Sequence, residues 1–238
     1  MDELDLLEEL DNADNLGQDL VSESSKSKDN TNTESWWDKT DIQPQKPLTD
    51  QFKKSGKSFS VYGIYEGKEV LPDTVVEKFV KLSTVLSNKG YVFRHSGSNT
   101  NNLQNKLLEI PNINTESYLP FPAFNKNIKK PKHKYPEPIS YQIAMHFVKN
   151  FTNLKPGLRA IISSRFNSIL GNGCLDPVDV MILYNRKGLE TTGKDVDYID
   201  SGDIPRIIYL CRECGIPYFN IGNDDSLNKL IDFIKNLS

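Results

Sequence analysis

From Phe59 onward, hydrophobic and polar positions alternate between strand-like and helix-like periods. Phe59–Ile64 alternates with the period of two expected of a strand. The apolar positions from Val75 to Leu86 instead follow a helical spacing, with Pro72 near the start of that helix. The predicted strands are 59–64, 91–93, 117–120, 176–184 and 215–220, and the predicted helices are 72–88, 103–109, 140–150, 158–170, a short apolar helix between 203 and 215, and 225–237.

This order predicts an α/β fold. Strands that alternate with helices favour parallel pairing through right-handed crossovers. We therefore expect residues 58–238 to form one Rossmann-like domain, a mostly parallel sheet with helices on both faces. Residues 1–57 read as an acidic tail that is too polar to bury a core and is predicted to be disordered.

Charge separates the tail from the body. Residues 1–57 contain 14 Asp or Glu and 7 Lys or Arg, whereas the body is mildly basic. Two motifs interrupt the tail: the apolar stripe of Leu4–Leu10 and the Trp36-Trp37 pair. Exposed tryptophans cost solubility, so Trp36-Trp37 is expected to dock on the body of the chain or on a partner. Both motifs read as contacts for a protein partner, and a homo-oligomer is possible.

Several classes of protein are disfavoured. Cys211 and Cys214 have CxxC spacing, but they fall inside a predicted helix and have no second ligand pair, which favours packing over zinc or redox chemistry. The sequence predicts no metal site and no cofactor. The acidic N-terminus is unlike a signal peptide, and no apolar run approaches the roughly 20 residues needed to span a bilayer. A cytoplasmic protein without membrane contact is expected.

The carboxyl ends of the predicted strands carry small and polar residues. In parallel sheets this edge is where ligands bind, and helix N-termini there favour anions. Arg94 offers bidentate phosphate contact, while Ser96 and Ser98 offer hydroxyls. The predicted ligand-binding residues are Arg94, Ser96, Gly97, Ser98, Gly202 and Asp203.

A basic, proline-interrupted loop covers residues 121–138. Its prolines keep the chain extended, so its lysines cannot neutralise one another along a helix. Such a loop suits phosphate contacts, but a plain solvated loop is the favoured interpretation. Lys129, Lys130 and Lys132 are the candidate nucleic-acid contacts.

The body resembles the DprA/Lonely-Guy-like (SLOG) Rossmannoid superfamily, in particular small members found in large tailed phages. The residues that carry this resemblance are Arg94 to Asn102, Tyr118 to Asn125, Arg165 to Gly171, Pro177-Val178-Asp179, Ser201-Gly202-Asp203 and Ile216 to Asn220. The resemblance implies a Rossmann-like fold, a nucleotide-derived ligand or single-stranded DNA, and, with the composition rich in asparagine and lysine, a phage protein acting in the host cytoplasm.

The chain departs from this family in the ligand motif. Ser96 replaces a glycine, and Lys106 stands where the family has a glutamate. Glycosidic cleavage needs carboxylates, so these changes favour binding without catalysis. A nucleotide N-glycosidase using Asp179, Asp203 or Glu109 is the enzymatic alternative. An inert scaffold whose tail does the work is a third possibility.

Overall fold

A single parallel sheet organises the described part of the chain. The structure, a computed structural model, describes residues 52–65, 70–98, 101–122, 124, 133–148, 150–188 and 203–237, so the Leu4–Leu10 and Trp36-Trp37 motifs lie outside it. Its strands are β1 (Ser58–Gly63), β2 (Val92–His95), β3 (Thr115–Tyr118), β4 (His133–Lys134), β5 (Val180–Tyr184) and β6 (Tyr218–Asn220). The described strands pair in the order β4-β3-β2-β1-β5-β6, and each pair is parallel.

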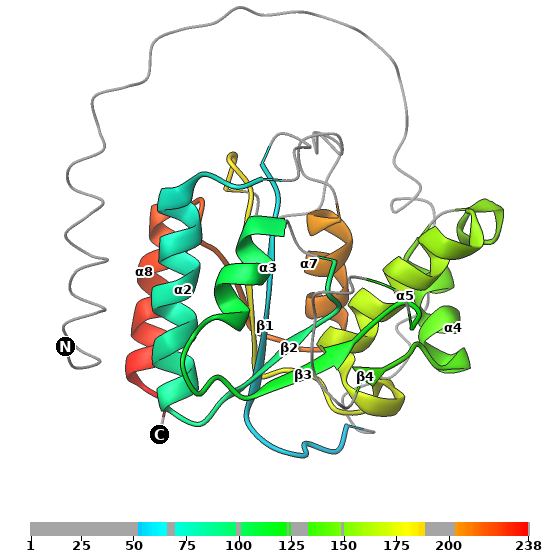
Figure 1. Ribbon diagram of the computed structural model, residues 1–238, viewed down its shortest axis with the longest axis horizontal. Coiled ribbons are helices and arrows are strands. Elements are labelled where there is room, and N and C mark those ends of the chain that lie inside the picture. The colour runs from blue at the N-terminus through cyan, green and yellow to red at the C-terminus, as the bar shows by residue number, and fades with distance from the viewer. Residues whose placement is uncertain are drawn as a thin grey trace, which may run out of the picture.

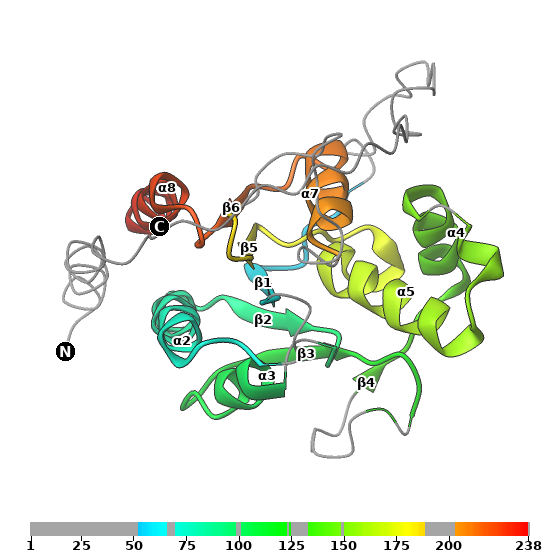
Figure 2. The same ribbon diagram turned by 90° about the horizontal axis from the view of Figure 1, so that it is seen from above.

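Helices cover both faces of this sheet (Figures 1 and 2). The helices are α2 (Asp73–Asn88), α3 (Asn101–Leu108), α4 (Pro138–Phe147), α5 (Pro156–Leu170), α7 (Ile204–Glu213) and α8 (Asp224–Lys235), with 3-10 turns at η4 (Phe151–Asn153) and η5 (Asn172–Cys174). Helices α2, α3 and α8 contribute to one buried hydrophobic cluster, and α4, α5 and α7 contribute to the other. The predicted α/β fold with two-sided helical cover is confirmed.

Strand β5 shows why the sheet needs cover on both sides. Its five residues are all buried. Val180, Ile182 and Tyr184 join the cluster under α2 and α8, whereas Met181 and Leu183 join the cluster under α5 and α7. Side chains of a strand point alternately to opposite faces, so an unbroken apolar run can be buried only between two layers of helix.

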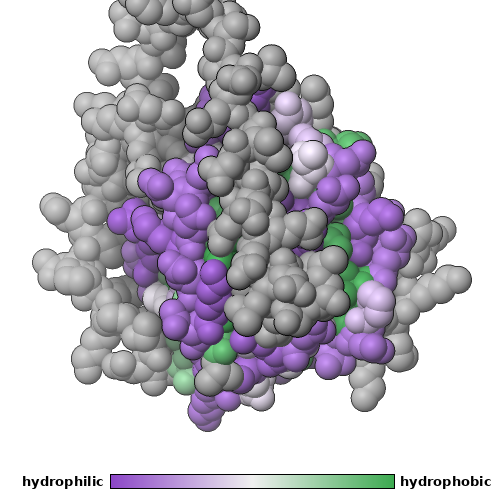
Figure 3. All heavy atoms as spheres, turned by 90° about the vertical axis from the view of Figure 1, so that its left-hand side faces the viewer, coloured by the Kyte–Doolittle hydropathy of each residue, from purple (hydrophilic) through white to green (hydrophobic). Residues whose placement is uncertain are grey.

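The outer layers differ in character. The described residues on the face formed by α2 and α8 are mostly hydrophilic (Figure 3). On the other side, α4 lies outside α5 and farthest from α2 and α8 (Figure 2). Within the described ranges, no helix is long and apolar enough to cross a membrane.

One element lies where the sequence predicts none. His133–Lys134 forms a short edge strand beside β3 inside the segment expected to be irregular. A two-residue strand has no periodicity to detect. Residues 53–55, which lie within the predicted tail, bond to the segment before β5.

The order in which strands are added to the sheet reverses between β1 and β5. After β1, the chain adds β2, β3 and β4 on one side of β1. It then returns to add β5 on the other side of β1, followed by β6. In open α/β sheets, ligands bind beyond the carboxyl ends of the strands at such a reversal. The fold therefore directs attention to the residues that follow β1, β2 and β5.

Candidate ligand site at the carboxyl edge of the sheet

Arg165 of α5 is the centre of a polar cluster at this edge. Its Nη2 donates to the backbone oxygen of Ser98 at 3.2 Å and to Ser98 Oγ at 3.0 Å. Its Nη1 donates to the carboxylate of Asp203, just before α7. The guanidinium carbon lies 4.4 Å from the ring centroid of Tyr62, near the end of β1. One side chain thus connects the ends of β1, β2 and the segment leading into α7.

Local structure delivers these groups to one place. Helix α5 begins with a proline in its first turn and packs against β1, β2 and β3. Asp203 precedes α7 and also accepts from Nη1 of Arg206, three residues along. This i, i+3 spacing puts Asp203 and Arg206 on the same side of the first turn. Two guanidinium groups therefore share one carboxylate.

A tight turn brings two hydroxyls to the cluster. Gly97 has a φ of 69°, in the left-handed region that glycine adopts without a steric penalty. Its neighbours Ser96 and Ser98 fold back on each other, and their Oγ atoms lie 2.5 Å apart. Ser98 is the residue that Arg165 holds, so the turn after β2 is fixed to α5.

The structure brings together four of the predicted ligand-binding residues. Ser96, Gly97 and Ser98 form the turn, and Asp203 reaches the same cluster through Arg165. The remaining predicted residues other than Arg94 lie outside the described ranges: Gly202, Lys129, Lys130 and Lys132.

Arg94 points away from this cluster. Although it precedes Ser96 by only two residues, its Nη1 donates to the backbone oxygen of Asp176 at 2.5 Å and its Nη2 to the Asp176 carboxylate at 2.5 Å. Its Nε donates to Glu116 at 2.7 Å. Asp176 precedes β5, so these bonds direct Arg94 toward the amino ends of the strands. Its side chain is 4% exposed, and its donors serve the protein itself.

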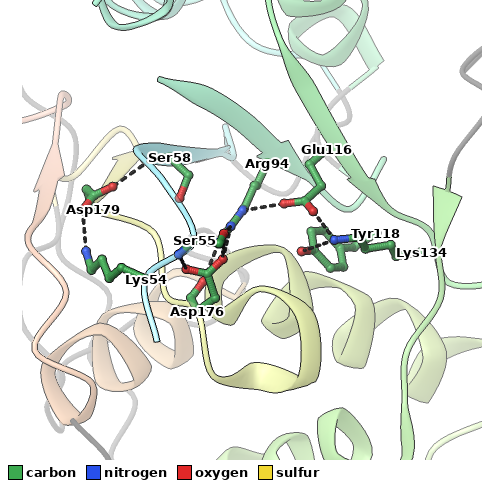
Figure 4. Close-up of polar contacts among 9 residues, drawn as sticks. All are labelled: Lys54, Ser55, Ser58, Arg94, Glu116, Tyr118, Lys134, Asp176 and Asp179. Atoms are coloured by element: carbon green, nitrogen blue, oxygen red, sulfur yellow. Dashed lines mark hydrogen bonds and ion pairs between the residues drawn. The ribbon is translucent and has the colours of Figure 1, made fainter. Parts of the chain in front are cut away.

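Further polar groups extend this second network, the amino-edge network, at both ends (Figure 4). On one side, Glu116 also pairs with Lys134 of β4. On the other, the Asp176 carboxylate accepts from the backbone nitrogen of Ser55 at 2.9 Å and from the Ser55 hydroxyl. The contacts thereby fasten the segment before β1 to the amino edge of the sheet.

Gly171 permits the close approach of Arg94 and Asp176. A Cβ at this position would lie 2.3 Å from the Asp176 backbone oxygen and 2.9 Å from Arg94 Nη1. Its φ of 72° is a second reason for glycine here. Part of the network is thus specified by a residue without a side chain.

The ionisation of the network follows from its geometry. Burial alone raises the pKa of the Asp176 carboxyl, but hydrogen bonds from Ser55 and Arg94 outweigh it and leave that pKa below its ordinary value. Burial likewise opposes ionisation of Glu116, and contacts with Lys134 and Arg94 lower its pKa overall. Both carboxylates are therefore charged at neutral pH and belong to a paired structural network.

The Arg165 cluster is bonded differently. Arg165 and Arg206 both donate to the carboxylate of Asp203. The Nε of Arg165 is buried without a hydrogen-bond partner. Buried polar groups are rarely left unpaired, and guanidinium groups together with hydroxyls bind phosphate or carboxylate well. The cluster is thus equipped to bind an anion.

Neither Arg165 nor Arg206 is among the residues that the sequence predicts to contact ligand. A signal for Arg165 exists: it is the single charged residue from Ala160 to Leu170, in a segment that is otherwise apolar, small or amide-bearing. A lone charge in a buried helix needs a partner. The sequence does not reveal that this partner is Asp203, because the two residues lie 38 positions apart.

The other predicted chemical groups lie elsewhere. Asp179 precedes β5 and pairs with Lys54, while Glu109 follows α3 and pairs with Lys106. Cys174, Cys211 and Cys214 are buried free thiols in the cluster under α5 and α7, and burial raises the pKa of Cys174 to about 12. Among the described residues, no group of three or more His, Cys, Asp or Glu is arranged to hold a metal ion.

Comparisons of the chain with protein-family models, with curated proteins and with solved structures found no match.

Proposed function

We propose that this chain is a non-catalytic binding protein that holds a nucleotide-derived ligand, or a stretch of single-stranded nucleic acid, at the carboxyl edge of its sheet. The observation that carries the proposal is the Arg165 cluster. Two guanidinium groups, two serine hydroxyls and one shared carboxylate meet beside the point where the strand order reverses. The resemblance of the body to the SLOG superfamily supports the same class of ligand.

Each group has a role in this proposal. The phosphate of the ligand takes N–H bonds from Arg165 and Arg206, in competition with the Asp203 carboxylate. Ser96 and Ser98 offer hydroxyls to phosphate or sugar oxygens. Arg94 is excluded from the site, since its guanidinium is buried in the amino-edge network.

The distribution of carboxylates favours binding over glycosidic cleavage. Of the three candidate carboxylates, only Asp203 lies at this edge, and it is paired with two arginines. Both of its carboxylate oxygens accept from a guanidinium group, so neither is free to take a proton from a substrate or water. Incubation with nucleoside monophosphates tests the enzyme alternative: free base that disappears in Asp203→Ala would refute the binding proposal.

Titration with a nucleoside monophosphate at low ionic strength tests the site itself. We expect Arg165→Gln and Arg206→Gln each to weaken binding by at least tenfold, because a hydrogen bond to a charged group contributes about 1.5–3 kcal/mol. Arg212→Gln is the matched control, because Arg212 lies in the last turn of the same helix, α7, at the opposite end from Arg206.

Two results would refute this proposal: no binding of any nucleoside monophosphate or single-stranded oligonucleotide, or equal binding by all three arginine variants. A mass-spectrometric search for nucleotides that co-purify with the protein would identify the natural ligand. It requires no prior choice of base or phosphate number.

Single-stranded nucleic acid is distinguished from a small nucleotide by its salt dependence. A polyanion that releases counterions loses affinity steeply as salt rises. If the basic loop contributes, Lys129→Ala combined with Lys130→Ala flattens that slope, whereas nucleoside monophosphate binding is unchanged. Action in a phage-infected host cytoplasm belongs to the same proposal and rests on composition and on the SLOG resemblance.

The tail is proposed to recruit a protein partner through Leu4–Leu10. A truncation should retain Phe52 and everything after it, since Ser55 is bonded to Asp176. If the truncated protein no longer pulls down the partner but still binds nucleotide, the two activities belong to separate parts of the chain. If the truncation abolishes partner binding and the intact protein binds no nucleotide, the scaffold alternative is favoured.

A further inference from the structure

Helix α4 exposes an uncharged surface. Its ten residues, Pro138–Phe147, include no Asp, Glu, Lys or Arg. Ser140, Ala144 and Phe147 are buried beneath it. The exposed positions are Pro138, Ile139, Gln142, Met145 and His146. At about 100° per residue these positions cover an arc of about 120° on the outer side of the helix.

Large apolar side chains contribute to this arc. Ile139 is 39% exposed and Met145 is 49% exposed. Tyr135, just before the helix, is also exposed, as is Leu158 in the first turns of α5, the helix that packs against α4. We call the surface formed by Tyr135, Ile139, Met145 and Leu158 the α4 face.

Helices α2 and α8 do not share this property. The exposed positions of α2 include Asp73 and Glu77, and those of α8 include Asp225, Lys229 and Asp232. Figure 3 shows the resulting hydrophilic surface on the side of α2 and α8. Several exposed apolar side chains on one helix, without intervening charge, are typical of a contact surface.

We infer that the α4 face is covered by the Trp36-Trp37 segment of the same chain. The described chain begins at Phe52, which packs against the hydrophobic cluster that also receives Tyr141 and Ile143 of α4. The described chain therefore begins on the face that carries α4. Fifteen residue steps separate Trp37 from Phe52, which span up to about 50 Å when extended. A domain of this size has a radius of gyration of about 16 Å, so this length is sufficient for the tryptophans to contact the α4 face.

The chemistry of the two surfaces is complementary. Indole rings bury about 150–250 Å² each and make favourable contacts with methionine sulfur, which Met145 provides. Glu34 and Asp38 flank the tryptophans. Lys155, just before α5, and Arg159 flank Leu158 in sequence and can pair with these carboxylates, whereas the single carboxylate next to α4 in sequence is Glu137, at its N-terminal end. Attachment to the same chain adds a high effective concentration.

The tryptophans themselves provide the readout, because Trp36 and Trp37 are the two tryptophans of the chain. In the intact protein we expect blue-shifted emission and weak quenching by acrylamide, compared with the protein unfolded in urea. Ile139→Gln combined with Met145→Gln should move both properties most of the way to the unfolded values. Both side chains lie outside the two buried hydrophobic clusters, and far-ultraviolet circular dichroism checks that the variant is folded. Val70→Gln is the matched control, since Val70 is 57% exposed next to α2.

Three outcomes would overturn the inference. Emission of the intact protein that equals that of the unfolded protein means that the tryptophans are free for an external partner. Blue-shifted emission that survives the double substitution means that they dock elsewhere. Emission that returns to the unfolded value on dilution, together with a dimer in light scattering at high concentration, means that a second copy supplies the contact.

Discussion

Two arginine-centred clusters lie at opposite edges of the same sheet, and they differ in how their arginines are bonded. In the amino-edge network, every guanidinium nitrogen of Arg94 donates to Glu116 or Asp176. In the carboxyl-edge cluster, Arg165 and Arg206 share the Asp203 carboxylate, and the Nε of Arg165 has no hydrogen-bond partner. A fully bonded arginine fixes the backbone around it, whereas an arginine with an unpaired donor has capacity for a ligand. An arginine next to a glycine-containing turn is therefore not sufficient evidence of a binding site.

Breaking the amino-edge network should have the largest effect on stability. Asp176→Asn leaves the buried Arg94 without its full counter-charge, and such a loss typically costs about 3–5 kcal/mol. The free energy of unfolding, measured by urea denaturation, reports the change. Asp179→Asn is the comparison, because its partner Lys54 is half exposed and exposed pairs contribute about 1 kcal/mol or less. Equal losses in the two variants would contradict a special role for the Arg94 contacts.

Acid should weaken the same network without a mutation, by a smaller amount at moderately low pH. Asp176 and Glu116 have pKa values below their ordinary ones in the folded state. The unfolded chain therefore binds protons first, at about pH 4. The contribution of both groups is complete above that pH and disappears as pH falls through the folded-state values. The urea midpoint should decline on acidification, and less steeply in Asp176→Asn than in the unaltered protein.

At the carboxyl edge, removal of a carboxylate should have the opposite sign. Asp203→Asn keeps the size of the side chain but eliminates the charge that competes with a phosphate for Arg165. We expect affinity for a nucleoside monophosphate to rise about tenfold, or about 1.4 kcal/mol. Isothermal titration at low salt measures it. Weaker binding by this variant would show that Asp203 positions the two arginines for the ligand instead of competing with it.

The outermost pair of the amino-edge network should matter least. Lys134 is 38% exposed and contacts Glu116 from the two-residue edge strand β4. Lys134→Ala should change the free energy of unfolding by about 1 kcal/mol or less. A loss as large as that of Asp176→Asn would mean that the stability of the network is shared evenly along its length.

The sequence was a good guide to the sheet because its signal is local. Phe59–Ile64 alternates with the period of a strand, and the run that ends at Tyr184 is a short unbroken apolar stretch. Gly171 marks the end of a helix, so each of these elements is visible within a short window. The edge strand at His133–Lys134 is too short to produce a detectable pattern in the sequence. It forms because β3 offers a free side to pair with, which is a property of the assembled sheet.

The site was predictable only in part, for a related reason. Ser96, Gly97 and Ser98 follow a strand directly, so their place at the carboxyl edge is a consequence of topology. The direction of a long side chain, in contrast, does not follow from topology. Arg94 has four rotatable side-chain bonds and turns toward Asp176, whereas Arg165 turns toward Asp203. These choices depend on partners 82 and 38 positions away along the chain.

The bonds between Ser55 and Asp176 also determine where the tail is attached to the domain. They fix the point at which the preceding residues leave the body to the amino edge of the sheet. Strands of five or six residues separate that edge from the Arg165 cluster by roughly 17–20 Å. The point at which the tail joins the body is therefore remote from the Arg165 cluster, and the Ser55 contacts leave that cluster uncovered.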